Sequence, residues 1–275
     1  CRATQRAKIA LGKEEYQKLQ ERARFFGLME EDSKEFGHEK GKVVFSDFKK
    51  NYLKASEKVI AEEVKRTTNG IAGAKTITDL ETAVKQITGK DVNLSGTDLE
   101  LMKKNMDQVA KLCGEYGIHF DSIETTAGRK YLGEVSRSGR YGDVVSLLYP
   151  KKYYKTKEAL IEELKKTASS GNMPRIGGRN IDVYSTTHEF AHTLSSSVTS
   201  RLYGTKAETD FWDEIEEVYR DYKENGNGIL GKYASSNQDE FLAEAFADAK
   251  LGARPSKWSE EVLVIVDKYF KKKGE

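Results

Sequence analysis

The sequence predicts an α+β protein: a mostly helical domain with a small β-sheet over residues 91–275, preceded by a helical N-terminal region over residues 1–90. Three observations support this fold class. Apolar residues recur at helical spacing in most segments of the chain. Short runs of strand-like composition are confined to residues 121–149. A length of 275 residues is enough for one or two domains.

The N-terminal region reads as a series of helices. A charged helix is expected from Lys13 to Arg24. Ser46 can cap a second helix, and the glycines of residues 69–73 are expected to break it.

Two further helices are predicted from their caps. Thr78 and Glu81 have the spacing of a capping box, which predicts a short helix up to Gly89. Thr97 is expected to cap the next helix, which the glycines at 114 and 117 end. Apolar side chains recur along that helix at helical spacing: Leu99, Met102, Met106, Val109, Ala110 and Cys113.

The sheet is expected from three short strands at residues 121–125, 131–135 and 143–149. We expect Val144–Leu148 to be the edge strand of this sheet. A sheet edge can pair with the extended main chain of a peptide. Thr156 then begins a helix.

The rest of the domain is predicted to be helical around one loop. Residues 169–180 are rich in glycine and serine and lack the spacing of a phosphate-binding loop, which argues against nucleotide binding. Ser185 can cap the following helix. Amphipathic helices are expected at residues 208–224 and 258–270.

The helix after Ser185 carries the motif HEFAH, from His188 to His192. Residues four apart on a helix lie on the same face, so both imidazoles can reach one ion. Glu189 lies beside them and can accept a proton from a water on that ion. This HExxH pattern is typical of zinc-dependent hydrolases. The alternative is a pair of polar residues on an ordinary surface helix.

A third ligand is expected from a second helix further along the chain. Glu240 and Glu244 are four residues apart and share a helix face. One glutamate can bind the metal while the other accepts a proton from a ligand histidine. Spacing alone does not decide which glutamate does which, and the alternative is a surface helix with solvated glutamates.

HEFAH followed by the segment YASSNQDEFLAEAF resembles the catalytic domain of the anthrax lethal factor group, which includes domains of polymorphic toxins and phage-associated proteins. The resemblance covers about residues 187–249. It does not extend to the other domains of lethal factor, so their partners and substrates are not implied.

The resemblance implies a zincin-type metallopeptidase domain that binds Zn²⁺ and cleaves a peptide or protein substrate. It implies that Glu189 is the general base, that Tyr233 stabilises the oxyanion and that Glu244 supports the site from behind the ligands. The zinc ligands that it implies are His188, His192 and Glu240.

Composition is that of a soluble protein, with 33% charged residues and a formal net charge of +2. This charge favours neither nucleic acid nor a membrane surface as a partner, and we expect no membrane span. The chain begins at Cys1, which indicates a fragment or a processed product; a mature bacterial lipoprotein is the alternative.

The chain begins with CRATQ, followed by a charged helix and the segment GLMEEDS. With these features, residues 1–55 resemble the tail of a phage portal-associated minor head protein. Phage capsid or portal proteins are therefore possible partners, and a charged helical extension is the alternative. The expected location is virion-associated, bacterial cytoplasmic or secreted.

The function expected from these patterns is zinc-dependent peptide hydrolysis. Two alternatives stay open. One is a phage head-associated structural or assembly protein with a vestigial or structural zinc site. The other is a zinc amidase that acts on the cell wall.

Overall fold

The computed structural model describes residues 65–88, 91–118, 120–128, 131–138, 144–174, 181–201 and 206–271. Contacts divide the chain into one unit at Cys1–Arg66 and another at Thr67–Glu275. The predicted helix at 13–24, the cap at Ser46 and the segment that resembles a phage head protein lie outside the described residues. We predicted a domain boundary near residue 90, whereas the contacts include the helix at Ile77–Thr88 in the second unit.

The helices near the start of the described part begin at other caps than expected. Residues 65–73 are helical, so Gly70 lies inside a helix that ends at Gly73. Helix α3 (Ile77–Thr88) is capped by Thr76 instead of Thr78. The backbone amide of Asp79 donates to Thr76 Oγ1 over 3.1 Å, and the amide of Thr76 donates to the Asp79 carboxylate over 3.0 Å. This reciprocal pair satisfies two amides that the first turn would otherwise leave free.

Helix α4 (Leu99–Tyr116) begins one residue later than predicted. Asp98 is its N-cap and accepts from the amide of Leu101 over 2.8 Å. The hydroxyl of Thr97 donates instead to the carbonyl of Leu94, within the preceding turn. Gly117 ends the helix in the left-handed conformation, where an L side chain is strained.

A four-stranded mixed sheet forms one side of the unit, and it confirms the α+β class. The strand order is β1-β2-β4-β3; the first three strands are parallel, and β3 is antiparallel to β4. The strands are β1 (Val92–Asn93), β2 (Ser122–Thr126), β3 (Glu134–Ser138) and β4 (Val144–Pro150).

The prediction that Val144–Leu148 is the edge strand is wrong. Strand β4 pairs with β2 on one side and with β3 on the other, so it is internal, and the edge strands are β1 and β3. The sequences explain this order: β4 reads VVSLLYP and suits a position between two strands, whereas β3 reads EVSRS and tolerates an edge.

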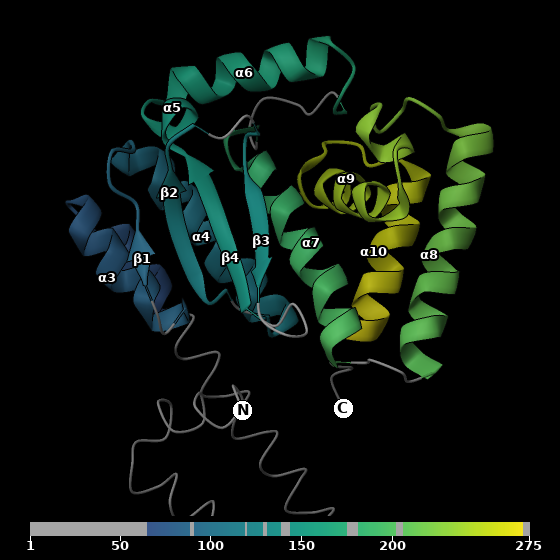
Figure 1. Ribbon diagram of the computed structural model, residues 1–275, viewed down its shortest axis with the longest axis horizontal. Coiled ribbons are helices and arrows are strands. Elements are labelled where there is room, and N and C mark those ends of the chain that lie inside the picture. The colour runs from purple at the N-terminus through teal and green to yellow at the C-terminus, as the bar shows by residue number, and fades with distance from the viewer. Residues whose placement is uncertain are drawn as a thin grey trace, which may run out of the picture. The chain divides into compact units, whose positions relative to one another are not determined.

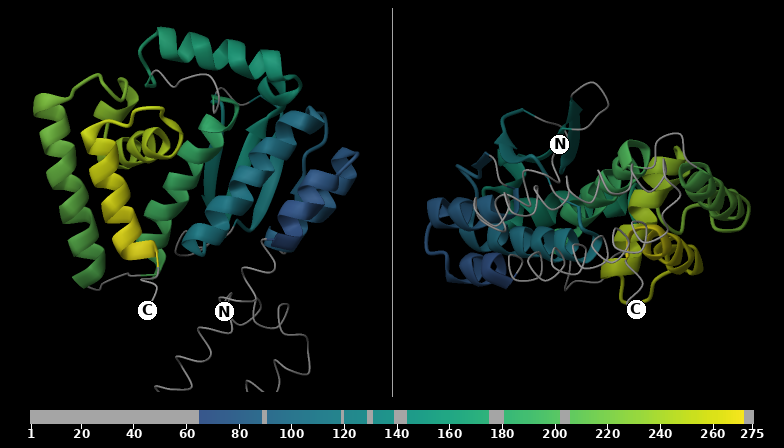
Figure 2. Two further views of the ribbon diagram at one scale, coloured as in Figure 1. Left: turned by 180° about the vertical axis from the view of Figure 1, so that it is seen from behind. Right: turned by 90° about the horizontal axis from the view of Figure 1, so that it is seen from below.

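Helices α3 and α4 cover one face of the sheet, as the rear view shows (Figure 2). After β4 the chain forms α5 (Lys151–Tyr154) and α6 (Lys157–Ser169), which arches over the top of the unit in Figure 1. Thr156 caps α6 by accepting from the amide of Ala159, as the sequence predicted.

The other side of the unit is helical (Figure 1). Helix α9 lies in its middle, against α7, α8 and α10, and is buried all the way from Phe241 to Asp248. The elements of this side are η1 (Ile181–Val183), α7 (Tyr184–Arg201), α8 (Lys206–Asn225), η2 (Tyr233–Ser235), α9 (Gln238–Leu251) and α10 (Lys257–Phe270).

Ser185 is not the cap of α7, contrary to expectation. The helix follows directly on the 3-10 turn η1 and begins at Tyr184, so Ser185 lies inside its first turn and is buried. Carbonyls of the turn can accept from the first amides of the helix, so no separate side-chain cap is needed there.

One hydrophobic core joins the sheet side to the helical side. Phe190, on the face of α7 opposite the motif histidines, is fully buried. Its ring lies 5.9 Å from the ring of Tyr116 on α4 and 6.3 Å from that of Phe246 on α9. Helix α7 is therefore held at a fixed rotation between the two sides, and this rotation decides where its polar face points.

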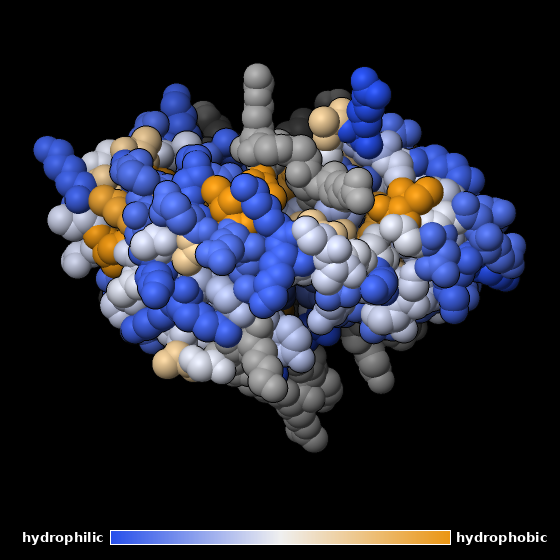
Figure 3. Space-filling view, turned by 90° about the horizontal axis from the view of Figure 1, so that it is seen from above, coloured by the Kyte–Doolittle hydropathy of each residue, from blue (hydrophilic) through white to orange (hydrophobic). Residues whose placement is uncertain are grey.

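The face seen from above is mostly hydrophilic, with hydrophobic residues in small separate patches (Figure 3). Within the described residues, no helix has both the length and the apolar character that a membrane crossing requires.

Candidate metal centre

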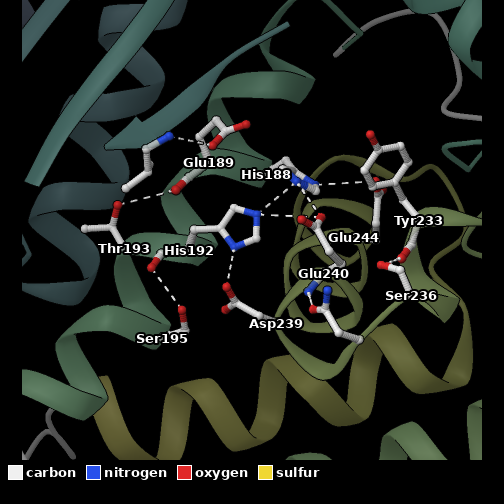
Figure 4. A network of polar contacts seen from close by, with 12 residues as sticks. His188, Glu189, His192, Thr193, Ser195, Tyr233, Ser236, Asp239, Glu240 and Glu244 are labelled. Carbon is white, nitrogen blue, oxygen red and sulfur yellow. Dashed lines mark hydrogen bonds and ion pairs between the residues drawn. The ribbon is translucent and has the colours of Figure 1, made fainter. Parts of the chain in front are cut away.

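Helix α7 presents His188 and His192 one turn apart on the face that looks toward α9 (Figure 4). The Nε2 atoms of the two imidazoles lie 3.2 Å apart, and the ring planes are inclined at 80°. Both rings are largely shielded from solvent. Phe190 and Leu194 anchor the opposite face of the helix in the core.

Helix α9 brings carboxylates to the same point from its first turn. Asn237 caps this helix and accepts from the amide of Glu240 over 2.9 Å. The Oε2 atom of Glu240 lies 3.4 Å from Nε2 of His188 and 3.7 Å from Nε2 of His192. In the described part of the chain, these three side chains form a group whose donor atoms all lie within 4.8 Å of one another.

The spacing of these donors suits a tetrahedral metal ion. Ligands at about 2.0–2.1 Å from a tetrahedral zinc lie about 3.4 Å from one another. The observed separations of 3.2, 3.4 and 3.7 Å scatter around that edge length. Both Nε2 atoms can bind one ion only when neither carries a proton, which leaves the proton of each ring on Nδ1. The residues present therefore fit zinc with three protein ligands.

The second nitrogen of each imidazole faces its own carboxylate. Nδ1 of His188 lies 3.5 Å from Oε1 of Glu244, at ion-pair distance, and Nδ1 of His192 lies 3.1 Å from Oδ2 of Asp239. The buried hydroxyl of Tyr184 donates to the other oxygen of Glu244. Helix α9 thus supplies a carboxylate to each side of the histidine pair (Figure 4).

Sequence reasoning missed Asp239 and Tyr184. A signal for Tyr184 existed, because it precedes His188 by four residues and shares its helix face. No comparable signal existed for Asp239. It directly precedes Glu240, and adjacent helix positions point in different directions.

Neighbouring charged groups shift the pKa values of the proposed ligands His192 and Glu240. Burial lowers the pKa of the His192 imidazole, but hydrogen bonds to Asp239 and Glu240 outweigh burial and raise it to about 10. Burial raises the pKa of Glu240, yet the two histidines hold it well below its ordinary value. The surroundings of these groups therefore favour a positive charge at their centre.

Burial raises the pKa of two other carboxyl groups near the histidines. The pKa of Glu244 rises to about 7, and that of Glu189 also lies above its ordinary value. A carboxylate whose pKa moves toward neutrality is suited to accept and return a proton.

Glu189 lies on the side of α7 that faces the edge strand. Its Oε2 atom accepts a hydrogen bond from the backbone amide of Val135 on β3 over 2.9 Å. Gly133 comes just before that strand, and a Cβ atom there would approach Glu189 Cγ to 2.9 Å and Ser185 Oγ to 2.7 Å. Glycine at position 133 therefore lets β3 approach α7 without displacing these two side chains.

A cavity of about 660 Å³ opens over the metal-binding group. Edge strand β3 forms one wall, and residues of α6, α7, α9 and η2 form the others. Tyr233 lines it with its side chain partly exposed, close to the histidines and Glu240 (Figure 4). Tyr131, which is 59% exposed, lines the same cavity. The cavity therefore brings together the six site residues predicted from the sequence, which are His188, Glu189, His192, Tyr233, Glu240 and Glu244.

Comparisons with protein-family models, with curated proteins and with solved structures found no match to this chain.

Proposed function

We propose that this chain is a zinc-dependent metallopeptidase. The observation that carries the proposal is the convergence of His188, His192 and Glu240 within 4.8 Å of one another, at the floor of a cavity that Glu189 also lines. Hydrolytic zinc sites use three protein ligands and keep one position open, whereas structural sites use four. Three donors in a cavity therefore support an enzyme better than a structural zinc site.

When bound, zinc supplies Lewis acidity, which lowers the pKa of a water ligand toward neutrality. Glu189 takes a proton from the attacking water and returns it to the leaving amine. Its place in the buried side of the cavity, with a raised pKa, supports this role. Tyr233 donates a hydrogen bond to the oxyanion that develops on the substrate carbonyl.

A peptide is the substrate class that we propose. Edge strand β3 lines the cavity, and an edge strand can align extended main chain by backbone hydrogen bonds. The resemblance of the motifs to the anthrax lethal factor group points to the same class. A cell-wall amidase would share the zinc chemistry and differ only in substrate.

The direct test measures zinc and cleavage in the same preparations. We expect about one zinc per chain after gentle purification and cleavage of members of a peptide library. Glu189→Gln should retain zinc while turnover falls by orders of magnitude, since both proton transfers pass through this carboxylate. Tyr233→Phe should retain zinc and lower the rate by about 10- to 1000-fold.

Two results would contradict the proposal. A protein that binds no zinc even when zinc is supplied is not a zinc enzyme. A protein that binds zinc and cleaves peptidoglycan but no peptide is the amidase.

A further inference from the structure

We infer that Asp239 is a positioning residue for His192 that holds the proton of this imidazole on Nδ1. The inference rests on the proposed metal site and deepens it. The observation is that Oδ2 of Asp239 lies 3.1 Å from Nδ1 of His192 while Nε2 of the same ring faces the metal-binding group.

The reason is the tautomer of the imidazole. His192 can offer a lone pair at Nε2 only if its proton is on Nδ1, and a carboxylate beside Nδ1 holds the proton there. The same carboxylate fixes the rotation of the ring and increases the basicity of Nε2. Because Asn237 caps α9, the backbone that carries Asp239 is also fixed.

Arg137, on edge strand β3, supports this arrangement from the other side. One of its terminal nitrogens donates to the carbonyl of His192 over 2.7 Å and to Ser195 Oγ over 3.3 Å. The same nitrogen lies 3.9 Å from Oδ2 of Asp239. The side chains of Arg137 and Asp239 are 38% and 40% exposed, so their ion pair by itself contributes little. We therefore expect Arg137 to affect zinc affinity less than Asp239 does.

The test is the zinc affinity of variants of the full chain, measured by competition with a chromophoric chelator. Asp239→Ala should weaken zinc binding by about 10- to 100-fold, the range seen when an outer carboxylate of a histidine ligand is removed. Asp239→Asn should weaken it less, because the amide oxygen can still accept from Nδ1. Asp213→Ala is the matched control, since Asp213 is exposed on α8, and it should bind zinc like the original protein.

A second readout separates positioning from general damage to the fold. The visible spectrum of the cobalt-loaded protein reports the geometry of the ligands. It should change in Asp239→Ala and stay the same in Asp213→Ala, while the metal-free thermal midpoint of Asp239→Ala stays near that of the original protein.

Zinc affinity and a cobalt spectrum unchanged in Asp239→Ala would overturn the inference and leave the proposed metal site intact. If the alanine variant does not fold, Asp239→Asn decides: unchanged affinity and an unchanged spectrum overturn the inference, and weakened binding in a folded protein supports it. Failure of the original protein to bind zinc would overturn the site and the inference together.

Discussion

Glu240 and Glu244 differ in which imidazole nitrogen they face, although they share one face of α9. Glu240 lies near the Nε2 atoms of both histidines, and Glu244 lies near Nδ1 of His188. The spacing of the two glutamates in the sequence allows either to be the ligand. The geometry favours Glu240 as the ligand and Glu244 as the partner of His188.

Alanine at these two positions should therefore have unequal effects on zinc affinity. Glu244→Ala should weaken zinc binding by about 10- to 100-fold, and Glu240→Ala should weaken it more, because a ligand is lost. The measurement is chelator competition on both variants. Weaker zinc binding in Glu244→Ala than in Glu240→Ala would reverse the assignment, and equal affinities would contradict it. Glu244→Ala also leaves the buried hydroxyl of Tyr184 without its acceptor, so this variant should be the less stable of the two.

Substitution of Gly133 should affect catalysis without affecting zinc binding. A methyl group there would press on the side chains of Glu189 and Ser185, and Glu189 would have to move. We expect Gly133→Ala to keep its zinc and to lose about 10- to 100-fold in kcat/KM, since small displacements of a catalytic group have large effects on rate. Gly73→Ala is the control, because a Cβ at Gly73 meets no atom within 4 Å. Equal rates in the two variants would show that Glu189 tolerates the shift.

Pairs of elements hold the site in place through a few polar contacts between them. Strand β3 meets α7 through the hydrogen bond from the Val135 amide to Glu189. It also meets α7 through the hydrogen bonds of Arg137 to the His192 carbonyl and Ser195 Oγ.

Helix α8 meets α10 through Asp221, which accepts from Trp258 Nε1 over 2.6 Å and from Lys257 over 2.9 Å. Helix α10 in turn packs on α9, so this contact supports the helix that carries the carboxylates.

The contact through Asp221 predicts a pH dependence of stability. Hydrogen bonds to Lys257, Trp258 and Asn225 lower the pKa of the Asp221 carboxyl from its ordinary value of 3.8 to about 2. Because the folded pKa lies below the unfolded one, the stabilisation is fully present above pH 3.8 and is lost as the pH falls from 3.8 to about 2.

Asp221→Asn tests this dependence, since the amide keeps an acceptor for Trp258 and loses the charge. The thermal midpoint of the original protein should exceed that of the variant near neutral pH, and the difference should shrink as the pH falls below 3.8. A difference that stays constant between neutral pH and about pH 2.5 would show that the charge of Asp221 contributes nothing.

In the folded unit the metal-binding group lies where two separate helices meet beneath the cavity. Both α7 and α9 have to be in place before the three donors converge, so the site exists only when the unit is folded. Binding of a metal to the folded form therefore stabilises it relative to the unfolded chain.

Added zinc should raise the thermal midpoint. At a free concentration about 100 times the dissociation constant, the gain is about 2.7 kcal/mol, which for a unit of this size corresponds to an increase of roughly 5–10 °C. Chelation should reverse it. His188→Ala should show no comparable increase, and a midpoint that does not respond to zinc in the original protein would contradict the metal site.

Features that depend on neighbours along the chain were predictable from the sequence alone. The α+β class, the position of HExxH on a helix and the cap at Thr156 all follow from helical spacing and local hydrogen bonding. The choice between adjacent caps, as between Thr97 and Asp98, did not follow, because threonine and aspartate are both favoured at the N-cap position.

Features that depend on contacts between distant segments were decided by the tertiary structure. The order of strands, which makes β3 rather than β4 an edge strand, depends on how each strand pairs with all the others. The partners of the histidines lie on a helix about fifty residues further along the chain. The rotations of α7 and α9 that bring Glu240 and Asp239 to His192 are set by core packing around Phe190 and Phe246, which no local pattern encodes.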